Sequence, residues 1–274
     1  MTSSPPPTST DLVLAERRGS VLLLTLNRPE RLNAWTDALE ERYYTHLDAA
    51  EDDPTIRAIV VTGMGRGFCA GADLSDLEQG SSQGVEAALR DRPRPRTRPL
   101  TVRKPMIAAI NGAAAGLGLV EALYCDVRFA TPTAKLTTAF AQRGLIAEYG
   151  ISWILPRLVG YSTALDLLLS GRVVLGEEAL RLRLVDRLSD PSQVVDDAVA
   201  YADDLAANSS PWSMATIKAQ VQADLDSSFD DAVAAAEELM IESFSCPDVE
   251  EGVRSYQEHR AAAFPALAPR SRTA

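Results

Sequence analysis

The stretch from Met106 to Asp126 constrains the fold of this chain more than any other part. It opens with an apolar run, Met106–Ile110, which is long enough for a buried strand and is interrupted by Asn111-Gly112. Small residues follow, and an apolar helix-like segment continues to Tyr124. A strand that enters a helix through a tight turn leaves free backbone N–H groups above the strand end. We therefore expect the rest of the chain to be arranged around a site at this turn.

The rest of the sequence alternates between strand and helix patterns and then becomes purely helical. Continuous apolar runs at 21–26 and 56–62 are typical of strands covered on both faces. A helix is predicted from about Thr36 to Glu51, with Thr36 as its N-cap. After Pro191 only helix patterns remain. The sequence predicts an α/β fold of successive βα units followed by a helical region.

These patterns divide the chain into four parts. We expect a core at 11–190 that carries the site, and a helical region at 191–264. Residues 1–10 are rich in Ser, Thr and Pro, with no basic start and no apolar centre, so we expect a disordered tail rather than a secretory signal. Residues 265–274 are expected to form a C-terminal tail.

Composition excludes several classes of function. The net charge of −11 argues against nucleic acid as a partner, and no apolar run approaches the roughly 20 residues of a membrane span. Three widely spaced cysteines, Cys69, Cys125 and Cys246, indicate reduced thiols and a cytoplasmic protein. The two histidines, His46 and His259, are isolated, so a histidine-based triad or metal site is not expected.

Several motifs occur in the order found in one known family. They are Asn27-Arg28-Pro29 with Leu32-Asn33-Ala34, Gly67 to Leu74 (GFCAGADL), Lys104-Pro105 with Ile107 to Gly112 (IAAING), Cys125-Asp126, Leu155 to Gly160 (LPRLVG), and Tyr256 with Phe264. In this order they resemble the crotonase (enoyl-CoA hydratase/isomerase) family, from about Leu12 to Phe264. The resemblance implies a superhelix of ββα turns, two nearly perpendicular sheets and a helical C-terminal region that builds trimers or dimers of trimers.

The resemblance also implies a substrate and a way to activate it. Family members bind an acyl-CoA thioester and form an enolate at its α-carbon. Two backbone N–H groups stabilise the enolate oxygen, and the matching donors here are Ala70 and Leu117. Coenzyme A enters as part of the substrate, and no metal or redox cofactor is implied.

The expected carboxylates show where this chain departs from hydratases of the family. Their first catalytic glutamate lies nine residues after the Asn of Asn-Gly and six before the Asp of Cys-Asp, and both counts give Val120. The neighbouring Glu121 points about 100° away on a helix, and we expect it to be paired elsewhere in the fold. The second glutamate is replaced near Phe140. Asp73 and Asp126 are expected to be structural.

Glu148 is the remaining candidate for the base, because isomerase-type relatives carry a lone acid at this turn. One group that removes a proton from one carbon and returns it to another is sufficient to move a double bond. We expect an acyl pocket lined by Val120, Phe140, Ile146 and Trp153. Such apolar surroundings would raise the pKa of Glu148. The alternative is a glutamate that faces solvent.

The resemblance also supplies candidates for coenzyme A binding. They are Arg28, Arg31, Leu32, Ala72, Asp73, Leu74, Tyr256 and Phe264, with Arg66 and the arginines between Arg90 and Arg103 as further candidates for phosphate contact. For the arginine- and proline-rich stretch itself, we expect a solvated mobile loop. For Tyr256 and Phe264, ordinary helix packing is an equal alternative.

Three functions follow. The first is an enoyl-CoA isomerase with Glu148 as the proton shuttle. The second is an enoyl-CoA hydratase with an atypical acid/base set. The third is an acyl-CoA-binding protein without catalytic activity.

Overall fold

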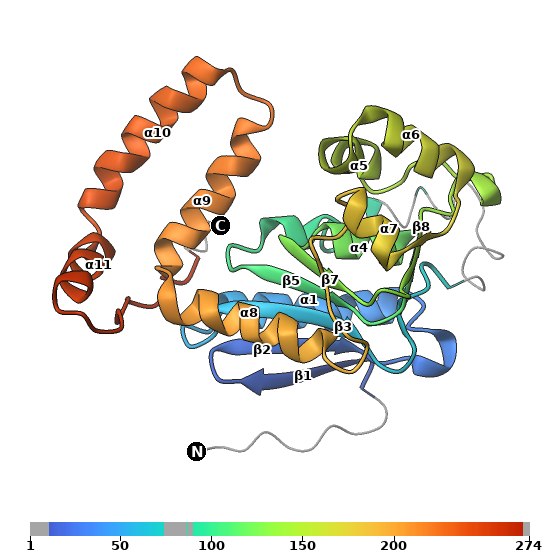
Figure 1. Ribbon diagram of the computed structural model, residues 1–274, viewed down its shortest axis with the longest axis horizontal. Coiled ribbons are helices and arrows are strands. Elements are labelled where there is room, and N and C mark those ends of the chain that lie inside the picture. Colours follow the sequence, from blue (N-terminus) through green and yellow to red (C-terminus); the bar gives the residue numbers. More distant parts are fainter. Residues whose placement is uncertain (1–10, 74–85, 87–89, 271–274) are drawn as a thin grey trace.

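The computed structural model describes residues 11–73, 86 and 90–270, and its centre is a six-stranded sheet (Figure 1). The strands run in the order β1 (Val13–Arg18), β2 (Val21–Leu26), β3 (Ala58–Gly63), β5 (Met106–Ile110), β7 (Val127–Ala130) and β10 (Arg187–Leu188). The β1–β2 pair is antiparallel and every other neighbouring pair is parallel. The apolar runs form the predicted buried strands.

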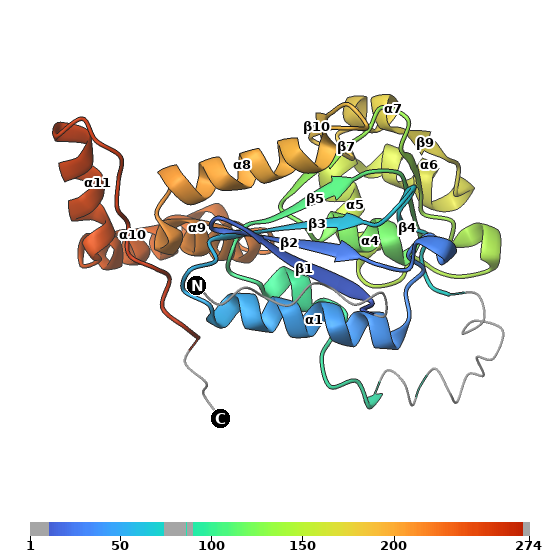
Figure 2. The same ribbon diagram turned by 90° about the horizontal axis from the view of Figure 1, so that it is seen from below.

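Alternation along these strands separates two apolar layers. The first layer, under α8 (Val194–Asn208), contains Val21, Leu23, Ala58, Val60, Ile107, Ala109 and Phe129. Ala198 and Ala202 are fully buried there, and their small side chains let α8 approach the sheet closely. The intervening residues of the same strands face α1 (Asp37–Asp52) and the larger core. Figure 2 shows the sheet between α8 and α1.

A second, four-stranded sheet carries the chain toward the site. Its order is β4 (Gly67–Cys69), β6 (Ala113–Ala115), β8 (Lys135–Thr137) and β9 (Val174–Leu175). β3, β5 and β7 of the first sheet are each followed by a strand of the second. The sequence predicted only a turn at Ala113–Ala115, and the structure shows that these residues form β6. The step between the sheets requires glycine, because a Cβ on Gly112 would lie 2.2 Å from the Arg66 carbonyl oxygen.

The remaining helices complete the core and a projecting arm. Around the second sheet lie α4 (Leu117–Leu123), α5 (Ile151–Val159), α6 (Tyr161–Ser170) and α7 (Gly176–Arg181). Short 3₁₀ turns occur at Pro29–Arg31, Arg98–Thr101 and Ala141–Arg143. The arm consists of α9 (Pro211–Asp224), α10 (Phe229–Phe244) and α11 (Pro247–Gln257), and it extends away from the sheets (Figures 1 and 2). The predicted helical C-terminal region is confirmed. None of the helices in the described ranges is both long and apolar enough to cross a bilayer.

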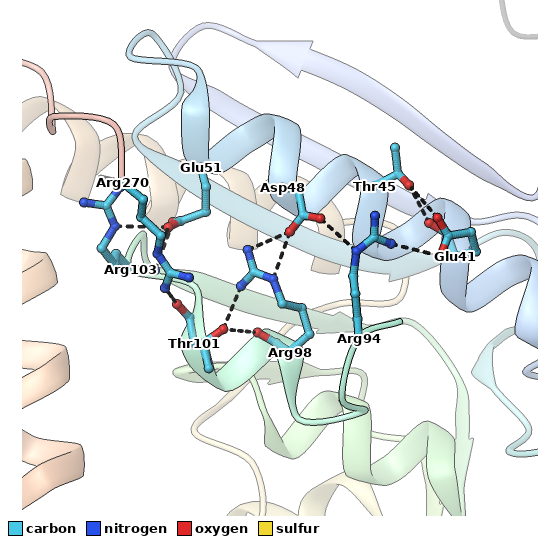
Figure 3. A network of polar contacts seen from close by, with 9 residues as sticks. All are labelled: Glu41, Thr45, Asp48, Glu51, Arg94, Arg98, Thr101, Arg103 and Arg270. Carbon is cyan, nitrogen blue, oxygen red and sulfur yellow. Dashed lines mark hydrogen bonds and ion pairs between the residues drawn. The ribbon is translucent and has the colours of Figure 1, made fainter. Parts of the chain in front are cut away.

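The arginine segment, residues 90–103, is docked on α1. Its ion pairs join Arg92 and Arg96 to Asp37 and Glu40. Figure 3 shows the pairs of Arg94 with Glu41 and Asp48, of Arg98 with Asp48, and of Arg103 with Glu51. The expectation of a solvated mobile loop is wrong for this segment. The acidic residues of α1 that the arginines meet lie three, four or seven positions apart, so they form one stripe along the helix.

The structure describes the start of the predicted C-terminal tail but not the predicted N-terminal tail. Residues 1–10 and 271–274 lie outside the described residues. Residues 265–270 lie beside the end of α1, where the Ala268 carbonyl accepts a hydrogen bond from Arg103 (3.0 Å) and Arg270 pairs with Glu51 at 3.2 Å (Figure 3). The start of the expected C-terminal tail is thus held against the core.

Candidate active site

A cleft of about 500 Å³ lies where the second sheet meets the start of α4. Its lining combines small backbone-exposing residues, apolar side chains and a few charges: Arg31, Ala34, Ala70, Gly71, Ala72, Asp73, Gly116, Leu117, Thr138, Ala139, Phe140, Arg143, Leu145, Glu148 and Tyr149. The expectation that the Met106–Asp126 stretch contributes to a site agrees with this position.

In the turn after β4, the Ala72 N–H has no acceptor among the described residues. Ala70 donates its N–H to the Leu32 carbonyl at 2.9 Å, so the predicted donor is already engaged. Trp35 forms a parallel bridge around Ala72, donating to the Gly71 oxygen (2.7 Å) and accepting from the Asp73 N–H (3.0 Å). In such a bridge the middle residue points its own N–H away from the partner, here toward the cleft that Ala72 lines. The donor is therefore Ala72, and the assignment to Ala70 is corrected.

The second donor is Leu117, the first residue of α4. The first N–H groups of a helix have no intrahelical acceptor, and within the described chain the Leu117 N–H has none. Gly116 places the helix start with a φ of +50°, and its carbonyl accepts from Leu119 and Val120. The two donor turns are close together, because a Cβ on Gly71 would lie 3.7 Å from the Leu117 nitrogen. The predicted placement of Leu117 at the site agrees with the structure.

This close approach depends on glycine at two positions. Gly71 has a φ of +94°, and a Cβ there would lie 2.7 Å from the Ala115 carbonyl oxygen. A Cβ on Gly118 would lie 2.2 Å from the Cys69 carbonyl oxygen. A side chain at Gly71 would push the turn after β4 away from β6, and one at Gly118 would separate β4 from α4. Together the two turns can stabilise one anionic oxygen with two backbone donors.

Glu148 lies across the cleft, on the turn before α5. Its side chain is half-buried, and burial raises its pKa above the ordinary glutamate value while the charge of Arg96 opposes this change. The next residue, Tyr149, has a φ of +54°, and its carbonyl accepts a hydrogen bond from the Tyr124 hydroxyl at 2.6 Å. Tyr124, at the end of α4, thus holds this turn in place. A carboxylate of this kind can accept a proton and return it.

Glu121 and Val120 lie on α4 behind the cleft rather than in its lining. Val120 is fully buried in the core. Glu121 is 3% exposed, and neither carboxylate oxygen has a hydrogen-bond partner among the described residues. The expectation that Glu121 pairs elsewhere in the fold is therefore wrong. Burial raises its pKa well above the usual range, Glu40 raises it further, and Arg96 opposes both.

We expect the substitution Glu121→Met to stabilise the protein. It removes an unpaired buried carboxyl at nearly constant volume, which predicts a gain of about 1–3 kcal/mol in the free energy of unfolding at pH 7. Because the folded-state pKa is raised, the wild type loses stability as the pH rises above the pKa of an unfolded glutamate. Urea unfolding at pH 5 and pH 8 should therefore show a larger gain at pH 8. A variant less stable than the wild type at both values would contradict this account.

The predicted acyl pocket is only partly assembled in one copy of the chain. Phe140 lines the cleft. Val120 lies beneath it, Ile146 is 78% exposed, and Trp153 is 39% exposed and stacks under the Arg157 guanidinium at 3.7 Å. None of these three lines the cleft, and for Ile146 the reason is that the turn directs Leu145 inward and Ile146 outward. Leu145 and Tyr149 are apolar lining residues that the sequence analysis missed.

The predicted coenzyme A residues differ in whether they line the cleft, are engaged by other residues, or lie outside the described chain. Arg31, Ala72 and Asp73 line the cleft, whereas Leu32 lies beside it, with its carbonyl bonded to Ala70. Arg28 is committed to the Asp73 carboxylate (3.0 Å) and the Ala34 carbonyl (2.6 Å), so both charges have structural partners. Leu74 lies outside the described residues.

The other candidates lie elsewhere. Tyr256, which is 82% exposed, belongs to α11 at the far end of the arm (Figure 2), and the Phe264 ring lies 3.7 Å from where a Cβ on Gly252 of the same helix would be. The arginine segment is engaged with α1 instead of facing the cleft. Asp126 accepts from the Met106 N–H (2.8 Å) and pairs with Lys218 (2.7 Å), which agrees with a structural role. In the part of the chain that the structure describes, no three His, Cys, Asp or Glu side chains are grouped as metal ligands.

Comparison with known proteins gives a consistent family. The model of the enoyl-CoA hydratase/isomerase family matches residues 16–266. A 1,2-epoxyphenylacetyl-CoA isomerase of Escherichia coli is 37% identical over 200 residues, which cover 72% of this chain and 76% of the relative. An enoyl-CoA hydratase from Bacillus anthracis superposes with a TM-score of 0.88 at 26% identity, over 94% of this chain and 100% of that one. An enoyl-CoA hydratase structure from Mycobacterium marinum is 51% identical, with a TM-score of 0.67 over 77% and 97% of the two chains.

Proposed function

Because the chain belongs to the enoyl-CoA hydratase/isomerase family, we propose that it is an isomerase that shifts a double bond in an enoyl-CoA thioester. One observation carries this choice. Of the described residues that line the cleft, only Asp73 and Glu148 have carboxylates, and Asp73 is held by Arg28 at 3.0 Å. Glu148 is therefore the one carboxylate in that lining without an ion-pair partner, and a single base is what an isomerisation needs.

The proposed reaction moves one proton. Glu148 removes a proton from the α-carbon of a 3-enoyl-CoA, and the electron pair moves onto the thioester oxygen as a dienolate. The N–H groups of Ala72 and Leu117 hold this oxygen, which lowers the free energy of the charged intermediate. The protonated Glu148 then returns the proton to the γ-carbon, and the double bond becomes conjugated with the thioester. The substrate carries coenzyme A, and the residues require no bound cofactor.

The competing functions predict different behaviour. Hydration of a 2-enoyl-CoA usually needs one group to activate water and another to protonate carbon, and the described lining has no second unpaired carboxylate. Purified protein should generate conjugated-thioester absorbance from a 3-enoyl-CoA faster than it removes it from a 2-enoyl-CoA. The reverse order of rates would favour a hydratase, and acyl-CoA binding without turnover would favour a carrier protein.

We also propose a homo-oligomer, a trimer or a dimer of trimers, in the cytoplasm. α10 contains no buried residue. Its large apolar side chains Phe229, Ile241 and Phe244 are 81%, 69% and 74% exposed. Large apolar side chains exposed together on one arm are typical of an interface. We expect light scattering to give a mass of three or six times 29.5 kDa. A single-chain mass at micromolar concentration would contradict the proposal.

A further inference from the structure

Arg96 belongs to the arginine segment but differs from its neighbours in what it contacts. Its side chain is 13% exposed and pairs with Glu40 at 3.3 Å and Asp37 at 3.6 Å on α1. Its backbone carbonyl accepts a hydrogen bond from the Tyr44 hydroxyl at 3.0 Å. The other side of the guanidinium lies over the Tyr149 ring, 4.8 Å from the ring centre. Arg96 thus connects α1 to the turn that carries Glu148.

The turn that Arg96 contacts needs external support. Tyr149 adopts a left-handed backbone conformation, with a φ of +54°, which is unfavourable for a residue with a large side chain. The Tyr124 hydroxyl holds the carbonyl of Tyr149, and Arg96 holds its ring. A cation stacked on an aromatic ring is attracted to the face of that ring. The two contacts together fix Glu148, the residue before Tyr149, relative to the donors across the cleft.

Glu40 joins this contact to the opposite wall of the site. Its Oε2 atom accepts a hydrogen bond from the Trp35 indole N–H at 2.9 Å and faces the Arg96 guanidinium. The Trp35 backbone is the partner in the bridge that turns the Ala72 N–H toward the cleft. The buried Glu40 carboxylate therefore contacts both Trp35, which orients one oxyanion donor, and Arg96, which stacks on the turn that carries the base.

We propose that Arg96 is a positioning residue of the reaction, held by Glu40 and stacked on Tyr149 so that it fixes the Glu148 turn and keeps a positive charge behind the base. This inference rests on the proposed function of Glu148. Arg96 does not line the cleft, so it acts through the turn and through its charge, and it does not touch the substrate.

The charge has a defined effect on Glu148. Burial raises the pKa of Glu148, and Arg96 lowers it. The other charged or titratable side chains around the cleft are Arg31, Asp73, Arg143 and Tyr149, and those packed behind Arg96 are Asp37, Glu40, Tyr44, Arg92, Glu121 and Tyr124. Of these groups, Arg96 lies behind the turn of the base, and its charge lowers the pKa of Glu148. Without Arg96 that pKa rises, and less of Glu148 is ionised at a given pH.

The test compares Arg96→Gln with Arg96→Lys, which keeps the charge. In Arg96→Gln, the acid limb of kcat/KM should move up by about one pH unit, because an adjacent opposite charge has been removed. The ionisation of Glu148 can be followed independently of turnover by its labelling with a carbodiimide and an amine, read by peptide mass spectrometry across pH. The labelling midpoint should move by the same amount in Arg96→Gln and stay near the wild-type value in Arg96→Lys.

The matched control is Arg94→Gln. Arg94 is in the same segment and pairs with the same helix, through Glu41 and Asp48, and it contacts neither Glu40 nor Tyr149 (Figure 3). Its acid limb and labelling midpoint should equal those of the wild type. If Arg96→Gln is unfolded by circular dichroism, Arg96→Met, which keeps the stem over Tyr149, carries the same comparison.

The outcomes separate the two proposals. An unchanged labelling midpoint in Arg96→Gln, or an equal change in Arg94→Gln, overturns the role of Arg96. A changed midpoint in an enzyme whose turnover survives Glu148→Gln supports the contact between Arg96 and Glu148 and overturns the proposed role of Glu148 as base. A changed midpoint together with a changed acid limb supports both.

Discussion

Replacing Glu148 by Gln is expected to reduce kcat for isomerisation of a 3-enoyl-CoA by about 10²–10⁴-fold. The amide keeps the shape of the side chain but cannot accept a proton from the α-carbon. Glu148 is the carboxylate in the described cleft lining that no ion pair engages, so no neighbour replaces it. Because burial raises its pKa, we also expect the wild-type acid limb above the ordinary range of a glutamate. Initial rates at conjugated-thioester absorbance measure both effects.

The matched control for Glu148→Gln is Glu121→Gln. It makes the same chemical change on α4, where the side chain is 3% exposed and lies outside the cleft lining. Its kcat should stay within about twofold of the wild type, since an interaction absent from the transition state does not change the rate. Loss of activity in Glu121→Gln with retention in Glu148→Gln would reverse the assignment of the base.

The second large effect is expected from Leu117→Pro, which deletes a backbone donor. Leu117 is the first residue of α4, a position that tolerates proline because its N–H has no intrahelical partner. Gly116, before it, has no Cβ to collide with the proline ring. The helix should therefore persist while one of the two oxyanion donors is lost. Loss of one such donor lowers kcat by about 10²–10³-fold.

The control for this variant is Leu117→Val, which removes a similar side-chain volume and keeps the N–H. It should lose little kcat, and the two variants should show similar circular dichroism and similar affinity for a saturated acyl-CoA. If Leu117→Val is as inactive as Leu117→Pro, the side chain and not the donor matters. If Leu117→Pro is folded and fully active, Leu117 is not an oxyanion donor.

Much of the fold could be predicted from local pattern. Thr36 caps α1 as expected, its hydroxyl accepting from the Leu39 N–H. Apolar runs became buried strands because a strand covered on both faces needs no alternation. The short strands β4, β6, β8 and β9 were missed, because two or three residues carry too little periodicity to be recognised.

The candidate site was predicted in outline and corrected in detail. Counting from both ends of the Met106–Asp126 stretch placed Val120 where an acid is expected, and the structure shows a fully buried valine there. The same stretch supplied Leu117. The other donor is Ala72 and not Ala70, because the Leu32 carbonyl accepts the Ala70 N–H, whereas the bridge with Trp35 leaves the Ala72 N–H free. Both partners come from a segment more than thirty residues earlier.

The sequence by itself determined the longer strands and helices, and it identified the family through motifs in a fixed order. Only the tertiary structure decided which polar groups are engaged. It showed that the arginine segment is docked on α1, that Arg28 holds Asp73, and that Glu121 has no hydrogen-bond partner in the described chain. The physical reason is that secondary structure follows from neighbours along the chain. A donor, a carboxylate or a guanidinium becomes available or occupied through partners that only folding brings within hydrogen-bond distance.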